Sequence, residues 1–100
     1  MIVHIVLFRF KEENKEAHIE KVSEMLNGLL ESVPTLKSME VGVNYSDQER
    51  AMDLSLISTF DNKVGLEQYA IHPEHVKVVE YIRGVVTESK VVDYVKIVNT

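Results

Sequence analysis

The segment Ile2–Phe10 constrains the fold of this chain more than any other part of the sequence. It is rich in β-branched and aromatic residues and too short for a free-standing apolar helix, which is typical of a buried strand. Successive side chains of a strand point to opposite faces of the sheet. One face carries Ile2, His4, Val6, Phe8 and Phe10, and the other carries Val3, Ile5, Leu7 and Arg9. Because the strand is apolar on both faces, something must cover each side of its sheet.

The next part of the chain alternates between helical and strand periods. Apolar residues at helical spacing predict a helix over about Asn14–Val33, which Pro34 ends. Its apolar stripe consists of Ile19, Val22, Leu26, Leu29, Leu30 and Val33. Strict alternation then predicts strands over Leu36–Tyr45 and Met52–Phe60, with the polar run 46–50 as the loop between them.

A second helical region is interrupted by a proline. Asp61 is a good N-cap for a helix over about Asn62–Tyr69, which must break before Pro73 because the residue preceding a proline is pushed out of the helical region. Pro73 suits the first position of a new helix that runs to about Val86. Its predicted apolar stripe is Val76, Val79, Ile82, Arg83 and Val86, with Val78 and Val85 beside it. A final alternating strand is predicted over Ser89–Val98.

The resulting order is strand, helix, strand, strand, helix, strand. It predicts an α+β fold, a ferredoxin-like βαββαβ sandwich whose four-stranded antiparallel sheet has both helical regions on one face. The length suits one domain, residues 1–100. Leaving the other, partly apolar face in water would forgo several kcal/mol at roughly 25 cal/mol per Å². We therefore expect a homodimer with the sheets packed face to face.

Composition and charge exclude several classes of function. The chain has no Cys, so neither a disulfide nor a thiolate site is possible. The formal charge is −5 and the basic residues are scattered, so nucleic acid is not an expected partner. The apolar N-terminal stretch is too short to span a bilayer. A signal peptide has positive charge before its apolar stretch, whereas here the positive charge comes after it. We therefore expect no membrane partner, and we expect a cytoplasmic location.

The stretch Tyr69–His75 is the one credible site for chemistry, because it gathers a phenol and two imidazoles around a helix break. His75 lies in the first turn of the helix that Pro73 opens, where unpaired backbone N–H groups disfavour imidazolium and keep the ring neutral, as a general base requires. Tyr69 can donate a proton or hold a carbonyl oxygen. If the His4 face of the first strand looks toward the helices, His4 and His75 line one pocket.

Each histidine also has a structural interpretation. His4 in an apolar strand can be a satisfied core residue, and His72, immediately before Pro73, can cap a helix. His18 is predicted to be solvated. A metal site is not expected, because the helix break spoils the spacing of His72 and His75 as paired ligands. No other cofactor is expected either.

The chain also resembles a known family. The residues that carry the resemblance are the segment His4–Lys11, Gly42 with Asn44, Phe60 with Asp61, the segment Tyr69–His75, and Asp93 with Tyr94. Together they resemble the stress-responsive dimeric α/β-barrel family, often called Dabb, over nearly the whole chain. The resemblance implies that two copies form a dimeric α/β barrel.

The resemblance to the plant polyketide cyclases of that family implies a chemistry. It makes His75 the general base and Tyr69 the group that holds the substrate carbonyl. It also implies a pocket for a small apolar carbonyl ligand, with His4, Val6, Leu26 and His72 as substrate-binding residues. Leu26 stands where the plant enzyme has a Tyr. The implied reaction is a cofactor-free intramolecular aldol condensation.

Three functions remain open at this point. The first is acid–base catalysis on a carbonyl compound by His75 and Tyr69. The second is a non-enzymatic, stress-related interaction protein whose histidines stabilise the fold and whose dimer surface is the functional part. The third is a cofactor-free monooxygenase, as found in the wider dimeric barrel superfamily.

Overall fold

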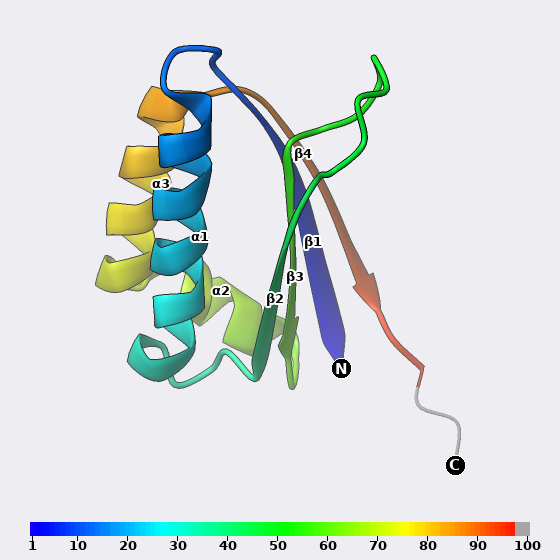
Figure 1. Ribbon diagram of the computed structural model, residues 1–100. Helices are drawn as coiled ribbons and strands as arrows, with labels where there is room; N and C mark the ends of the chain where they lie inside the picture. The colour runs from blue at the N-terminus through cyan, green and yellow to red at the C-terminus, as the bar shows by residue number, and fades with distance from the viewer. Residues whose placement is uncertain (98–100) are drawn as a thin grey trace.

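The computed structural model describes residues 1–97, in which one sheet carries helices on one side (Figure 1). The order of the elements confirms the predicted pattern, with the second helical region divided into two helices at Pro73. The elements are β1 (Ile2–Phe10), α1 (Lys15–Ser32), β2 (Ser38–Val43), β3 (Leu54–Phe60), α2 (Lys63–Ile71), α3 (Pro73–Val85) and β4 (Val86–Val95).

The sheet has the strand order β2-β3-β1-β4, and all neighbouring strands are antiparallel. This is the ferredoxin-like arrangement that the sequence predicts. The doubly apolar strand β1 lies inside the sheet, between β3 and β4. Its central position explains why polar residues are rare on either of its faces.

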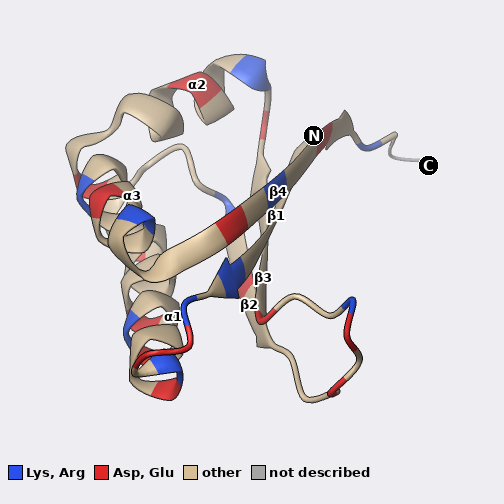
Figure 2. Ribbon diagram, turned by 90° about the horizontal axis from the view of Figure 1, so that it is seen from above, with Lys and Arg blue, Asp and Glu red and all other residues tan. Residues whose placement is uncertain are grey.

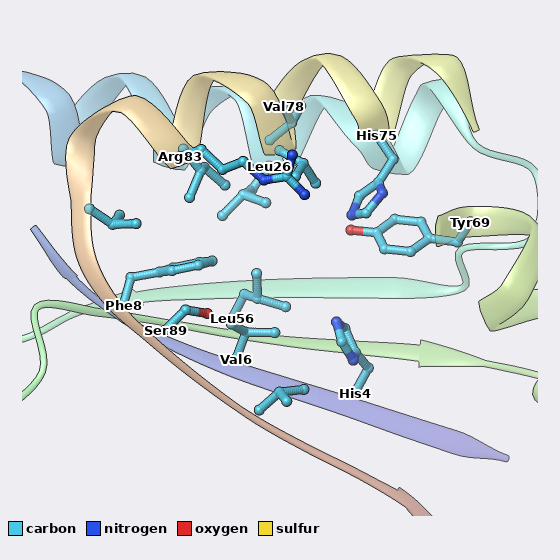
Figure 3. Close-up of a pocket in the computed structure, with 14 residues that line it drawn as sticks. His4, Val6, Phe8, Leu26, Leu56, Tyr69, His75, Val78, Arg83 and Ser89 are labelled. Carbon is cyan, nitrogen blue, oxygen red and sulfur yellow. The ribbon is translucent and has the colours of Figure 1, made fainter. Parts of the chain in front are cut away.

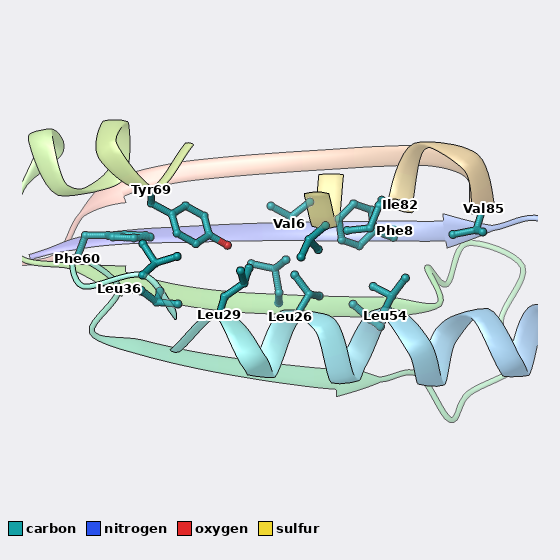
Figure 4. Packing of buried hydrophobic residues seen from close by; sticks show 14 of the residues in the cluster. Val6, Phe8, Leu26, Leu29, Leu36, Leu54, Phe60, Tyr69, Ile82 and Val85 are labelled. Carbon is teal, nitrogen blue, oxygen red and sulfur yellow. The ribbon is translucent and has the colours of Figure 1, made fainter. Parts of the chain in front are cut away.

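The hydrophobic core lies between the sheet and the helices (Figure 4). Helix α1 contributes Val22, Leu26 and Leu29, which are spaced by one or two helical turns and are each at most 2% exposed. The prediction for Leu30 was wrong: this side chain is 45% exposed. It follows Leu29 by one residue, about 100° around the helix, and so turns away from the sheet.

Helix α2 begins one residue later than predicted. The cap is Asn62 rather than Asp61, because the Asn62 side chain accepts a hydrogen bond from the backbone N–H of Gly65 at 2.8 Å. Asp61 instead lies 3.4 Å from the Lys37 amine. The helix continues to Ile71 and ends, as expected, before Pro73.

The predictions for α3 and β4 need correction. The buried residues of α3 are Val78, Ile82 and Val85, whereas Val76 is 40% exposed and Arg83 is also exposed. The apolar stripe is therefore rotated from the predicted one.

Strand β4 follows helix α3 without a loop and starts at Val86, three residues before the predicted start. The reason is that Val86 and Glu88 pair with the end of β1, at Phe10 and Arg9. The predicted end of the strand at Val98 lies outside the described residues.

The sheet face opposite the helices is open, as the right side of Figure 1 shows. An apolar row crosses its middle, because Ile5 of β1 is paired with Ile57 of β3 and with Val92 of β4. Val92 is 52% exposed, and Tyr94 on the same face is 45% exposed.

Acidic and basic residues are interspersed along the helices and the β2–β3 loop rather than gathered into a basic patch (Figure 2). None of the described helices is long and apolar enough to cross a membrane.

Candidate functional site

A cavity of about 350 Å³ lies between the sheet and helix α3 (Figure 3). Most of its wall is aliphatic, and three of its polar side chains, His4, Tyr69 and His75, gather at one end. The lining residues are His4, Val6, Phe8, Leu26, Leu56, Tyr69, His75, Val78, Val79, Ile82, Arg83, Val86, Ser89 and Val91. Five of the six predicted site residues thus meet in one space; the sixth, His72, does not line it.

His75 projects into this cavity from the first turn of α3. Its Nδ1 lies 3.1 Å from the backbone oxygen of Ala70. A carbonyl oxygen can only accept, so Nδ1 carries the proton and the neutral ring has its free lone pair on Nε2. Burial lowers the pKa of His75; the Ala70 hydrogen bond opposes that shift, and the nearby His4 and His72 add to it. His75 is thus neutral at pH 7 and suited to act as a base.

His72 supports this geometry from outside the cavity. Its Nδ1 accepts a hydrogen bond from the backbone N–H of Glu74 at 3.1 Å, so it is the N-cap of α3, with Pro73 in the first turn. The structural role considered for His72 is therefore the one that the structure shows. By fixing the start of α3, His72 fixes where His75 points.

Tyr69 lies beside His75 and is only 1% exposed. Its ring packs between Phe60, at a centroid distance of 5.0 Å, and His75, at 4.2 Å. The hydroxyl points into the cavity (Figure 3). Burial raises the pKa of Tyr69, so the phenol remains protonated and can donate a hydrogen bond to an oxygen atom in the cavity.

His4 approaches the same end of the cavity from β1. Its ring meets that of Tyr69 edge-on, with centroids 6.5 Å apart. Its Nδ1 is hydrogen-bonded to the Asp93 carboxylate. A carboxylate that accepts from Nδ1–H orients the imidazole, leaving Nε2 for the cavity.

Two site residues were not identified from the sequence. Asp93 faces His4 directly across the β1–β4 pair, and only the strand register, which a single sequence does not give, reveals that contact. Arg83 was assigned to an apolar stripe of α3, yet it lines the cavity. The sequence did contain a sign of this role, because Arg83 is a charged residue in a predicted stripe that otherwise consists of valines and an isoleucine.

His18 is not solvated as predicted. It is half-buried, its ring meets Tyr81 edge-on at 6.3 Å, and its buried Nδ1 has no hydrogen-bond partner within the described residues. His18 does not line the cavity. Within residues 1–97, no three His, Asp or Glu side chains gather closely enough to hold a metal ion. The chemistry that the cavity's own side chains offer is proton transfer.

Comparisons with known proteins agree with the family resemblance and with the fold. The model of the Stress responsive A/B Barrel Domain family, Dabb, matches residues 2–96. A stress-response A/B barrel domain-containing protein of Arabidopsis thaliana is 26% identical over 94 residues, covering 91% of this chain and 82% of that protein. Olivetolic acid cyclase of Cannabis sativa is 25% identical over 95 residues, covering 93% of this chain and 94% of the cyclase. A solved dimeric protein of unknown function and ferredoxin-like fold from Bacteroides fragilis has a TM-score of 0.83 at 29% identity, with 93% of each chain covered.

Proposed function

Because this chain belongs to the Dabb family of stress-responsive A/B barrel domains, we propose that its cavity performs acid–base chemistry on a small apolar carbonyl compound. One observation carries the proposal. The Ala70 carbonyl holds the proton of His75 on Nδ1, and this neutral ring lies 4.2 Å from the ring of a protonated tyrosine in an apolar cavity. A base and a hydrogen-bond donor therefore serve the same small space.

The first step is the removal of a proton from the carbon next to the carbonyl group. Nε2 of His75 takes this proton, and the electron pair of the C–H bond moves into the carbonyl group to give an enolate. The Tyr69 hydroxyl donates a hydrogen bond to the enolate oxygen, where negative charge develops. His4, oriented by Asp93, is the third polar group at this end of the cavity.

The second step is an intramolecular aldol condensation when the compound has a second carbonyl group. The enolate carbon attacks the carbon of that second group and forms a C–C bond, while the C=O π electrons move to its oxygen. The resulting alkoxide takes the proton back from the His75 imidazolium, and loss of water from the β-hydroxy carbonyl product completes the condensation. The similarity to olivetolic acid cyclase supports this reaction type. Val6 and Leu26 contribute apolar surface against the rest of the ligand, and His72 contributes by holding the start of α3.

We also propose that the protein is a homodimer through the open sheet face. The row of Ile5, Ile57 and Val92 has no cover within residues 1–97. Apolar rows of this kind are stabilised by a second copy with a self-complementary surface. The Bacteroides fragilis protein of the same fold is described as dimeric, which supports the proposal. The cavity lies on the other side of the sheet and stays accessible in such a dimer.

The catalytic part is tested without knowing the natural substrate. Heptan-2-one is dissolved in D₂O with the protein, and deuterium incorporation beside the carbonyl group is followed by NMR. The wild-type protein should accelerate exchange, and His75→Ala should lower the protein-dependent rate by about 100-fold or more, the usual contribution of a positioned base.

A matched control removes a histidine from elsewhere in the fold. His18→Gln changes a half-buried ring outside the cavity and should keep the exchange rate. If the wild-type protein produced no exchange above buffer, or His75→Ala exchanged as fast as the wild type, the acid–base proposal would be wrong. The non-enzymatic binding role would then be favoured.

A further inference from the structure

Among residues 1–97, Arg83 is the only permanently charged residue that lines the cavity. Every other lining residue is apolar, neutral and polar, or a histidine. Figure 3 shows the guanidinium projecting from α3 into the middle of the cavity, beside Leu26 and Val78. The cavity thus holds a base and a cation that both come from α3, and most of the remaining wall is aliphatic.

Arg83 has no anionic partner within residues 1–97. Two nearby cations are paired: the Lys77 amine lies 3.2 Å from the Glu74 carboxylate, and Nε of Arg9 lies 3.2 Å from the Glu88 carboxylate. Glu80 lies one helical turn before Arg83, yet it forms no salt bridge with it. An unpaired guanidinium in a chain of formal charge −5 is a feature that an anionic ligand would satisfy.

The position of Arg83 on α3 sets the separation between its guanidinium and the His75 ring. It follows His75 by eight residues, which corresponds to about 12 Å along a helix. Long helical side chains lean toward the N-terminus, so the guanidinium reaches back toward His75 and shortens that distance. Val78, Val79 and Ile82 line the cavity between the two residues. A short aliphatic chain fits this interval.

We propose that Arg83 binds a carboxylate, and that the compound processed at His75 is an oxo acid whose carbonyl and carboxylate groups are separated by an aliphatic spacer. This inference rests on the proposed function and narrows it: the carbonyl and the aliphatic spacer lie near His75, as proposed for an apolar compound, and the remaining group of the compound is a carboxylate. The guanidinium can hold a carboxylate with two parallel N–H···O bonds. Arg83 is therefore a determinant of specificity and not a catalytic residue.

A purely structural role for Arg83 makes a different prediction. The residue lies in the last turn of α3, where a cation interacts favourably with the helix dipole. In that role Arg83 would influence thermal stability, but it would not distinguish a charged ligand from its neutral ester. The preference between such a pair of ligands is the quantity to measure.

The experiment uses the full chain and two probes, 6-oxoheptanoate and its methyl ester, which share the oxoalkyl chain; the ester lacks the negative charge and carries one more methyl group. Amide chemical shifts of the ¹⁵N-labelled protein are followed during titration with each probe. The wild-type protein should bind the acid at least about tenfold more tightly than the ester, the scale of a charge-assisted contact. Arg83→Gln should bring the ratio close to one, and Arg83→Lys should keep part of it.

Lys77→Gln is the matched control, since it removes a positive charge from the same helix outside the cavity. It should keep the preference for the acid. Equal affinities of the wild type for acid and ester, or a preference that survives in Arg83→Gln, would overturn the inference. If the inference fails in this way but the ester still shifts the amide signals around His75, the proposed function is not contradicted. If neither probe binds, the inference is also overturned, and the deuterium-exchange experiment then tests the proposed function separately.

Discussion

The helix-covered face of the sheet and its open face are built from alternate residues of the same strands, yet their apolar side chains have different surroundings. On β3, Leu54 points toward the helices and is 1% exposed, whereas its neighbours on the other face, such as Ile57, are only half-buried. The side chains of the covered face pack against helices of the same chain and leave a mostly aliphatic cavity that also contains His4, Tyr69 and His75. The open face presents an apolar row and remains incomplete in one copy. The proposed chemistry and the proposed dimer interface therefore lie on opposite sides of one sheet.

The largest expected effect comes from truncating a leucine on the covered face. Leu54→Ala should lower the free energy of unfolding by about 2–5 kcal/mol, because a fully buried side chain leaves a cavity in the core. Ile57→Ala is the matched change on the open face of the same strand, and at high dilution it should cost clearly less. Urea denaturation at two protein concentrations measures both. An equal loss for the two variants in the dilute sample would contradict the difference between the faces.

A charge on the open face should dissociate the dimer. Val92→Glu would bury a carboxylate at the proposed interface, so the dissociation constant should rise by about 100-fold or more. Val64→Glu is the control, because Val64 on α2 is 55% exposed and Val92 is 52% exposed. Sedimentation velocity at micromolar concentration reports the result. A wild-type monomer, or a Val92→Glu variant as dimeric as the control, would refute the proposed assembly.

A smaller effect should appear as a pH dependence that originates on the covered face. The folded chain lowers the pKa of His75, so the unfolded chain binds a proton first as the pH falls. Stability should therefore be retained above about pH 6.5, the ordinary histidine value, and decline as the pH falls toward the lower pKa of the folded state. His75→Gln should flatten this part of the stability profile. A His75→Gln profile as steep as that of the wild type would assign the dependence to other groups.

The sequence predicts the order of the elements well because hydrophobic periodicity is a local property. Strands and helices were placed to within a few residues, and β1 was assigned its complete length. The remaining errors concern choices between neighbours. Asp61 and Asn62 are both good caps, and the backbone geometry, which decides between them, is not visible in composition. Likewise the start of β4 depends on how far β1 extends as its partner.

The candidate site shows the same division between local and long-range information. The convergence of Tyr69 and His75 was predicted because both belong to one helix break. The contribution of His4 required only that its face of β1 look toward the helices, which it does. The Asp93 contact depends on a strand register between positions 89 residues apart. No local pattern reports such a contact.

The central claim is that His75 is a neutral base whose Nε2 faces the cavity, and ¹⁵N NMR of the histidine rings tests it most directly. At pH 7 the His75 signals should show the Nδ1–H tautomer of a neutral imidazole, and its titration midpoint should lie below the ordinary value of about 6.5. Assignment through His75→Gln identifies the ring. An imidazolium at pH 7, or a neutral ring protonated on Nε2, would contradict the account.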